Sequence, residues 1–298
     1  MIPLDTSKHT GRFPLLCTLL LCLAILMPLP VHADDDVTIS TKILGGIEAK
    51  PGDWPWMVAL LRADRKDIFN AQYCSGVLID ATWVLTAAHC VVDRSTSAVE
   101  LAVGAYDLSR FSGPRISAKR LIVHPDYNTT NYQNDIALIE MTQAANLPTI
   151  TLFSGLSKDG TPSDLIGIML TAIGWGMADG AEYWYYPKVL RQVDLPVLPD
   201  SYCNKIYHTT LGSGQLCAGY YVGKDVCNGD SGGPVVTRID EQWVHAGLVS
   251  YGTPCNKYYG WYGVYTRTSA YQDFIRQYVP NARFTSSPSL SWMLLLLK

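Results

Sequence analysis

Short apolar runs separated by glycine, proline and asparagine recur along most of the chain, from about residue 43 to residue 281. Clear examples are Trp83–Thr86, Ile136–Ile139 and Val244–Val249. Runs of this length, bounded by turn residues, are typical of the strands of a barrel or a sandwich. One segment differs, because Ser269–Tyr278 has apolar residues at helical spacing and ends shortly before a proline. The pattern therefore predicts an all-β domain with one terminal helix.

The longest apolar run lies near the N-terminus. Phe13–Met27 carries no charge, follows Arg12, and is succeeded by small residues at Val31–Ala33 that offer a cleavage site. This arrangement predicts a signal peptide over residues 1–33 and a secreted, extracellular product. The alternative is an uncleaved signal anchor, because Phe13–Val31 just reaches the length that spans a bilayer. Two prolines and the shortness of the apolar core favour cleavage.

The C-terminal residues 282–298 form a serine-rich tail that ends in the apolar run Trp292–Leu297. This run is too short to cross a bilayer and shorter than a lipid-anchor signal requires. Three interpretations remain open: a weak surface anchor, a degraded sorting signal, or a simple apolar terminus. None of them predicts a firm association with a membrane.

Composition adds two constraints. The chain has 298 residues and a net charge of −3, which allows one or two domains and gives no reason to expect nucleic acid as a partner. It has 8 cysteines, of which Cys17 and Cys22 lie in the signal peptide. An even set in an exported chain predicts three disulfides and leaves their pairing open. The remaining cysteines are Cys74, Cys90, Cys203, Cys217, Cys227 and Cys255.

A glycine-rich turn carries the most specific chemical signal. Asn228–Pro234 places Ser231 among glycines, which permit unusual dihedral angles and let a substrate carbonyl approach backbone N–H groups. A serine hydroxyl is a poor nucleophile without a base. His89, within Thr86–Cys90, supplies an imidazole, and Asp135 supplies a carboxylate that can orient the ring. The three residues predict nucleophilic catalysis by a Ser-His-Asp triad.

The same turn also fits the G-x-S-x-G pattern of α/β-hydrolases, in which the acid and the histidine follow the serine. Here only His245 follows Ser231, and Asp240 lies too close to that histidine for separate loops of a large sheet. The order His89, Asp135, Ser231 instead resembles that of the trypsin-like serine proteases, the chymotrypsin-fold family.

This resemblance covers about 240 residues and implies one peptidase domain over residues 43–281. The implied fold is two six-stranded antiparallel β-barrels, at about residues 43–150 and 151–281, packed together with a C-terminal helix. The resemblance also selects the disulfides Cys74–Cys90, Cys203–Cys217 and Cys227–Cys255. A further bridge of many relatives has no counterpart, because the matching positions are Leu170 and Thr237.

The resemblance assigns a role to each residue of the site. His89 would accept the proton of Ser231 and later pass it to the leaving amine, while Asp135 holds the imidazole. Ser250 matches a serine that supports the buried aspartate. The backbone N–H groups of Gly229 and Ser231 would form the oxyanion hole.

The expected substrate specificity follows from three matched positions. Asp225 corresponds to the floor of the primary specificity pocket, and Gly252 and Gly263 correspond to its walls. A carboxylate at the end of a deep slot favours a long cation, so we expect cleavage after Arg and Lys. Val226 offers no hydroxyl to an ammonium group, which favours Arg.

The resemblance further implies synthesis as a zymogen. Residues 34–42 would form a prosegment that is removed by cleavage after Lys42. The new ammonium group of Ile43 would then pair with Asp230. Because Lys42 is itself basic, either this enzyme or another trypsin-like protease would serve as the activator.

No cofactor is expected to be required. Tyr262 stands where relatives with an aromatic residue bind Na⁺, so a Na⁺ site near it is one interpretation, and aromatic packing in a tyrosine-rich loop is the other. Neither Ca²⁺ nor another metal is predicted, because the chain lacks an acidic calcium loop and histidines at metal-ligand spacing. Asn128 begins a glycosylation sequon.

The expected partners are peptides and proteins that contain Arg or Lys, together with protein inhibitors, and the enzyme is expected to be a monomer. The alternative from another class is a binding protein that keeps the protease fold without turnover. Such relatives usually lack a triad residue or the activation junction. Both are present here, which favours the enzyme.

Overall fold

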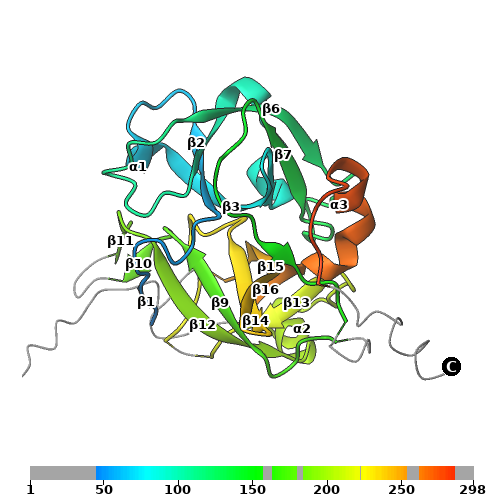
Figure 1. The fold of residues 1–298 in the computed structure, drawn as a ribbon. Coiled ribbons are helices and arrows are strands. Elements are labelled where there is room, and N and C mark those ends of the chain that lie inside the picture. The colour runs from blue at the N-terminus through cyan, green and yellow to red at the C-terminus, as the bar shows by residue number, and fades with distance from the viewer. Residues whose placement is uncertain (1–44, 157–162, 180–183, 222, 254–261, 286–298) are drawn as a thin grey trace, which may run out of the picture. The chain divides into compact units, whose positions relative to one another are not determined.

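Two closed six-stranded antiparallel β-barrels make up most of the fold, which confirms the predicted fold class (Figure 1). The computed structural model describes residues 45–156, 163–179, 184–221, 223–253 and 262–285, and all of them belong to one compact unit. The expected signal peptide, the prosegment, the Lys42–Ile43 junction, Cys255 and the tail from residue 286 onward lie outside the described residues.

The first barrel closes in the order β2-β3-β4-β7-β6-β5. Its strands are β2 (Met57–Arg62), β3 (Gln72–Asp80), β4 (Trp83–Thr86), β5 (Val99–Val103), β6 (Ile116–Val123) and β7 (Ala137–Met141). Two of the apolar runs noted in the sequence are neighbours here, because β4 pairs with β7 and Leu85 lies opposite Leu138. Both leucine side chains are fully buried, so the apolar residues of these runs fill the interior of the barrel.

The second barrel closes in the order β12-β13-β16-β15-β14-β9 and back to β12. Its strands are β9 (Met169–Gly174), β12 (Arg191–Leu198), β13 (Gln215–Ala218), β14 (Pro234–Ile239), β15 (Gln242–Tyr251) and β16 (Gly263–Arg267). Along β12 buried residues alternate with more exposed ones, as expected for a strand with one face in the barrel. The apolar run Val244–Val249 forms the buried centre of β15.

The fold also contains several short strands and helices. They are β1 (Ile47–Glu48), β8 (Thr151–Leu152), β10 (Ala178–Asp179), β11 (Trp184–Tyr185), α1 (Ile68–Ala71), α2 (Ser201–Tyr207), α3 (Gln272–Tyr278), η1 (Ala88–Cys90), η2 (Thr96–Ala98) and η3 (Thr268–Tyr271). The predicted terminal helix is confirmed as η3 followed by α3. Helices α1 and α2 were not predicted, since four and seven residues are too few to show a helical period. Within the described ranges no helix is long and apolar enough to span a bilayer.

The two ends of the described chain cross between the barrels. Strand β1 pairs with β12 of the second barrel, whereas α3 packs against the first (Figure 1). The contact includes Phe274 of α3, whose ring lies 4.9 Å from that of His124. One hydrophobic cluster contains Ile275 of α3, first-barrel residues such as Leu138, and Leu248 of the second barrel. The barrels therefore share a core at their interface.

Two of the expected disulfides are present as predicted, Cys74–Cys90 and Cys203–Cys217. Cys227 is also disulfide-bonded, and its expected partner Cys255 lies outside the described residues. At the site of the missing bridge, Leu170 is fully buried and the Thr237 hydroxyl donates to the carbonyl of Met169 at 3.1 Å. Packing and a hydrogen bond thus take the place of that covalent link.

Candidate active site

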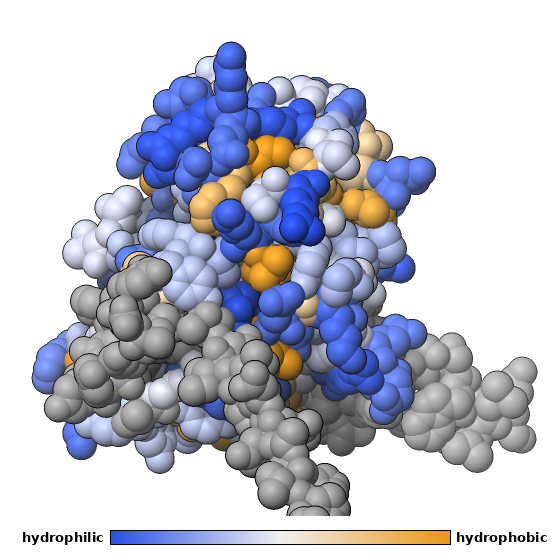
Figure 2. Space-filling view, turned by 90° about the vertical axis from the view of Figure 1, so that its left-hand side faces the viewer, coloured by the Kyte–Doolittle hydropathy of each residue, from blue (hydrophilic) through white to orange (hydrophobic). Residues whose placement is uncertain are grey.

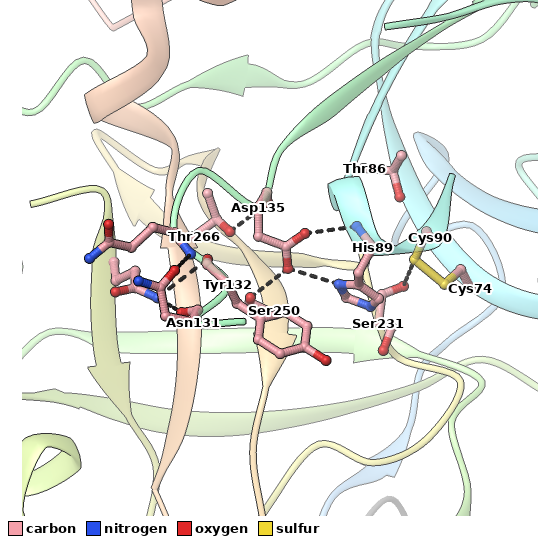
Figure 3. A network of polar contacts seen from close by, with 12 residues as sticks. Cys74, Thr86, His89, Cys90, Asn131, Tyr132, Asp135, Ser231, Ser250 and Thr266 are labelled. Carbon is pink, nitrogen blue, oxygen red and sulfur yellow. Dashed lines mark hydrogen bonds and ion pairs between the residues drawn. A yellow bond between two sulfur atoms is a disulfide. The ribbon is translucent and has the colours of Figure 1, made fainter. Parts of the chain in front are cut away.

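His89 is held at the interface of the barrels by the turn that follows β4. It lies in η1, one residue before Cys90, so the Cys74–Cys90 disulfide fixes the turn to β3. Its Nδ1 lies 2.8 Å from Oδ2 of Asp135, and its backbone N–H donates to Oδ1 of the same carboxylate at 2.9 Å (Figure 3). Because Nδ1 faces a carboxylate, it carries the ring proton, and Nε2 is left as the acceptor.

Asp135 is completely buried just before β7, yet its carboxylate is well supplied with donors. Ser250 of β15 donates to Oδ2 at 2.6 Å, from the side opposite His89 (Figure 3). The Thr266 hydroxyl of β16 donates to the Asp135 carbonyl at 2.7 Å. The second barrel therefore fixes an aspartate of the first. The family resemblance predicts Ser250, whereas no motif in the sequence marks Thr266, which lies 131 residues from Asp135 along the chain.

Ser231 is brought to His89 by the turn that leads into β14. Its carbonyl accepts from the Ser75 N–H of the first barrel at 2.8 Å, which fixes the turn across the interface. His89 and Ser231 line the same two cavities. Among the described residues no hydrogen bond joins the Ser231 hydroxyl to the ring. Such bonds often form fully only when substrate is bound.

The turn needs glycine at two positions. Gly232 has φ +73°, and a Cβ there would overlap Thr86 Oγ1 of β4. Gly229 has φ +101°, a conformation that other residues rarely adopt. Its carbonyl accepts from Gln72 Nε2 at 2.9 Å, which the sequence did not predict. In the described structure the N–H groups of Gly229 and Ser231 have no acceptor, so both are free to bind an oxyanion.

The predicted specificity pocket is a cavity of about 250 Å³ that contains Asp225, His89 and Ser231. Asp225 is 4% exposed and accepts from the N–H of Val226 at 2.8 Å. Burial, with a smaller contribution from the negative charge of Asp230, raises the pKa of Asp225 to about 7. The pocket thus contains a carboxylate whose charge a bound cation would stabilise.

The wall positions also lie together. Gly252 lines the cavity, and a Cβ on it would lie 4.0 Å from the Cα of Gly263. A Cβ on Gly263 would come within 2.9 Å of the Tyr265 hydroxyl, which is buried and has no partner in the described structure. Glycine at position 263 therefore leaves room for a buried hydroxyl that the sequence did not single out.

Asp230, the expected partner of the new N-terminus, is buried behind the same turn. It accepts from the N–H groups of Gly176 at 2.7 Å and Cys227 at 2.9 Å. Burial raises its pKa to about 6. A Cβ on Gly174 or Gly176 would overlap this carboxylate. No cationic side chain of the described part lies within ion-pair distance, and Lys42 and Ile43 lie outside it.

Two tyrosines lie at positions that bear on the sequence predictions: Tyr132 beside His89, and Tyr262, the residue near which a Na⁺ site was considered. Tyr132, which the sequence did not indicate, lies with its ring 5.9 Å from that of His89 and 5.2 Å from that of Tyr251, and it lines the cavity that contains Asp225. Tyr262 packs against Tyr202, with ring centroids 5.3 Å apart.

Metal ions in proteins are commonly bound by His, Cys, Asp and Glu side chains. In the described ranges the only cluster at ligand spacing is Cys74, His89 and Cys90. Its two sulfur atoms are bonded to each other, so they cannot act as thiolate ligands.

Comparisons with known proteins agree with this geometry. A family model described as Trypsin matches residues 43–275. Tryptase of Mus musculus is 34% identical over 281 residues, which cover 88% of this chain and 97% of that protein. Trypsin-3 of Salmo salar is 34% identical over 262 residues, or 85% of this chain and 97% of that one. Vitamin K-dependent protein C of Rattus norvegicus is 33% identical over 257 residues, but the chain spans only 53% of its length.

Proposed function

Because this chain belongs to the trypsin family of serine proteases, we propose that it is a secreted endopeptidase, made as a zymogen, that cleaves peptide bonds after Arg or Lys. The observation that carries the specificity is the buried Asp225 carboxylate in the cavity that His89 and Ser231 line. Protein substrates follow from the family, and the preference for a basic residue follows from this carboxylate.

The proposed mechanism uses the groups already described. Ser231 Oγ attacks the peptide carbonyl carbon while His89 Nε2 takes the hydroxyl proton, and Asp135 stabilises the resulting imidazolium. The negative oxygen of the tetrahedral intermediate accepts from the N–H groups of Gly229 and Ser231. As the C–N bond breaks, His89 passes its proton to the leaving nitrogen. A water molecule, deprotonated by His89, then hydrolyses the acyl ester and restores Ser231.

The specificity is tested with two peptides that differ only in Arg or Phe before the scissile bond. The activated enzyme should show a kcat/KM at least about a hundredfold higher for Arg, since a buried charge pair is worth about 3 kcal/mol. Asp225→Asn, which keeps the shape of the side chain, should lose most of this difference. A wild-type preference for Phe would contradict the proposal.

Activation is proposed to follow cleavage after Lys42. The Ile43 ammonium group would pair with Asp230, which is buried with two N–H donors and lacks a described cation. Loss of one partner of a buried pair costs about 3–5 kcal/mol, so the uncut chain should be about two to four orders of magnitude less active. N-terminal sequencing tests this, because active enzyme that began at Asp34 would rule out the proposed junction.

Active-site labelling distinguishes the proposed endopeptidase from the alternative function, a protease-fold binding protein without turnover. A fluorophosphonate should label Ser231 after limited tryptic activation, and the Ser231→Ala variant should remain unlabelled. Secretion rests on the N-terminal segment and is tested by recovery from the medium of a eukaryotic host. Asn128 is exposed, so in such a host it should be accessible for N-glycosylation, and the mass of the secreted protein would show any glycan attached there.

A Na⁺ site near Tyr262 is a separate proposal. The Tyr262 carbonyl accepts from the Tyr207 hydroxyl at 2.7 Å, and residues 254–261 lie outside the described structure. If Na⁺ binds there, kcat/KM should fall when choline replaces Na⁺ at constant ionic strength. Unchanged activity would remove the proposal.

A further inference from the structure

Two cavities meet at His89 and Ser231, and they differ in charge. The smaller contains Asp225 and would receive the substrate residue before the scissile bond. The larger, of about 480 Å³, extends from Ser231 past Cys74 to Arg62 and Arg65. Because a peptide that fills the first cavity must continue past the nucleophile, the second is left to the residues after the scissile bond.

Among the described residues, those that line the larger cavity include cationic side chains and no acidic one. Arg62 and Arg65 line it, and among the described residues neither has a carboxylate within ion-pair distance. Asp67 is engaged elsewhere, because it caps α1 by accepting from the N–H of Asn70 at 2.8 Å. Asp64 lines an adjoining cavity beside Arg62 but forms no ion pair there. The chain as a whole carries a net charge of −3, so this positive region is a local feature.

Hydrogen bonds from a single side chain hold the loop that carries the two arginines in one conformation. The Arg115 guanidinium donates to three carbonyls of this loop, those of Arg62, Arg65 and Lys66, at 3.0, 2.7 and 2.8 Å. Arg115 is itself fixed by Glu100 at 2.6 Å. Figure 2 views this side of the molecule and shows hydrophilic side chains gathered over its upper, first-barrel half. A loop fixed before binding loses little entropy when a ligand arrives.

Tyr73 fixes the direction of Arg62. The Arg62 guanidinium lies 5.3 Å from the centre of the Tyr73 ring, and that of Arg94 lies 3.9 Å from it. Arg94 also donates to the carbonyl of Cys90 at 3.0 Å. The Arg62 side chain makes no hydrogen bond within the described part of the chain. Its N–H donors therefore remain available to a carboxylate.

We propose that Arg62 and Arg65 form an anion-binding subsite for the residues after the scissile bond, so that this enzyme prefers Asp or Glu there. The proposal rests on the proposed function and adds a second charge requirement: a cation before the cleaved bond and an anion after it.

The test uses peptides with Arg before the scissile bond and Glu, Ala or Lys at the first or second position after it. Mass spectrometry of the products follows only cleavage after that Arg, because the introduced Lys is itself a possible cleavage site. The activated wild-type enzyme should cleave the Glu peptides about fivefold to tenfold faster, by kcat/KM, than the Lys peptides at low salt. That is the size expected of one or two exposed ion pairs, and the ratio should shrink at high salt. In the double variant Arg62→Gln/Arg65→Gln the Glu-to-Lys ratio should fall to about one.

Arg238→Gln is the matched control, because Arg238 of β14 is exposed, pairs with Glu241 in the following turn, and lines neither cavity. It should keep the wild-type ratio. A wild-type ratio near one, a ratio that survives in the double variant, or an equal loss in Arg238→Gln would each overturn the subsite. An Arg-aminocoumarin amide, which has no residue after the bond, separates the two proposals: no hydrolysis of it would contradict the proposed function instead.

Discussion

At the scale of single residues, three buried aspartates at the site differ in the groups that face them. Asp135 receives donors from His89 and Ser250. Asp230 receives two backbone N–H groups, and Asp225 receives one. Of these last two groups, Asp225 has fewer donors to stabilise its charged form against burial, and burial raises its pKa to about 7, compared with about 6 for Asp230.

This shift predicts that binding of an arginine mimic depends on pH. A bound cation requires ionised Asp225, whose pKa in the free protein is about 7, so affinity should be full above that pH and fall below it. Between pH 8 and pH 6, the Kd of benzamidine should rise about tenfold. Calorimetry measures this without involving the catalytic step. Asp225→Asn should bind weakly at both pH values, and a constant wild-type Kd would contradict the assignment.

At the scale of elements, two segments each contain one residue whose role can be tested by a single substitution. These segments are the connection from β9 to β10 and the strand β15. Gly176 lies in the connection and donates to Asp230, and its missing side chain leaves room for that carboxylate. His245 lies on β15, fully buried, with Nδ1 3.0 Å from the Thr268 hydroxyl and Nε2 without a described partner.

Gly176→Ala should therefore displace Asp230 and lower kcat/KM. The loss should be about a hundredfold, the effect of removing a charge-assisted hydrogen bond and its burial site. Gly212→Ala is the control, because its Cβ would meet only the Gln133 side chain at ordinary contact distances of 3.4 Å and more. Equal activity of the two variants would show that this space is not needed.

His245 should make the fold sensitive to acid. Burial lowers its pKa from 6.5 to about 3, so the unfolded chain binds a proton that the folded protein rejects. The stability from this group is complete above about pH 6.5 and is lost as the pH falls toward 3. Between pH 7 and pH 5, the loss in free energy of unfolding should be about 2 kcal/mol smaller in His245→Gln than in the parent.

Urea unfolding in a Ser231→Ala background, which prevents autolysis, measures the difference. Other buried groups titrate in the same range, but they are common to both proteins and cancel in the comparison. An identical pH dependence of the two proteins would contradict the neutral, buried state of His245.

The elements also show how far the sequence could lead. Runs such as Trp83–Thr86 and the motif around Ser231 are local patterns, and they predicted the strands and the serine protease family correctly. Strands of two residues, such as β1 and β8, are too short to show any period. Contacts such as Gln72 with Gly229 join residues 157 positions apart, and a pattern of buried faces does not say which partner lies opposite. Tyr132 was missed for the same reason.

At the scale of the whole described molecule, the barrels are joined by a shared core and by crossed ends. Ile275 of α3 is fully buried in a cluster that includes residues of both barrels. A cavity there weakens contacts on each side of the interface. The barrels should therefore unfold together.

Ile275→Ala tests this cooperativity and should lower the free energy of unfolding by about 2–4 kcal/mol. Tryptophan fluorescence and far-UV circular dichroism should still report one coincident urea transition. A variant that unfolds in two separate steps would show that the barrels are independent.

The crossing of β1 and α3 has a consequence for damage to the chain. Residues 142–150 connect the last strand of the first barrel to β8, and Thr142–Ala144 are exposed there. A nick at this point would leave an N-terminal fragment that contributes a strand to the other half, and a C-terminal fragment whose helix clasps the first. Each fragment would hold the other in place, so a molecule cut here, where no Arg or Lys stands, by a protease of another specificity should keep its fold and the arrangement of its active-site groups.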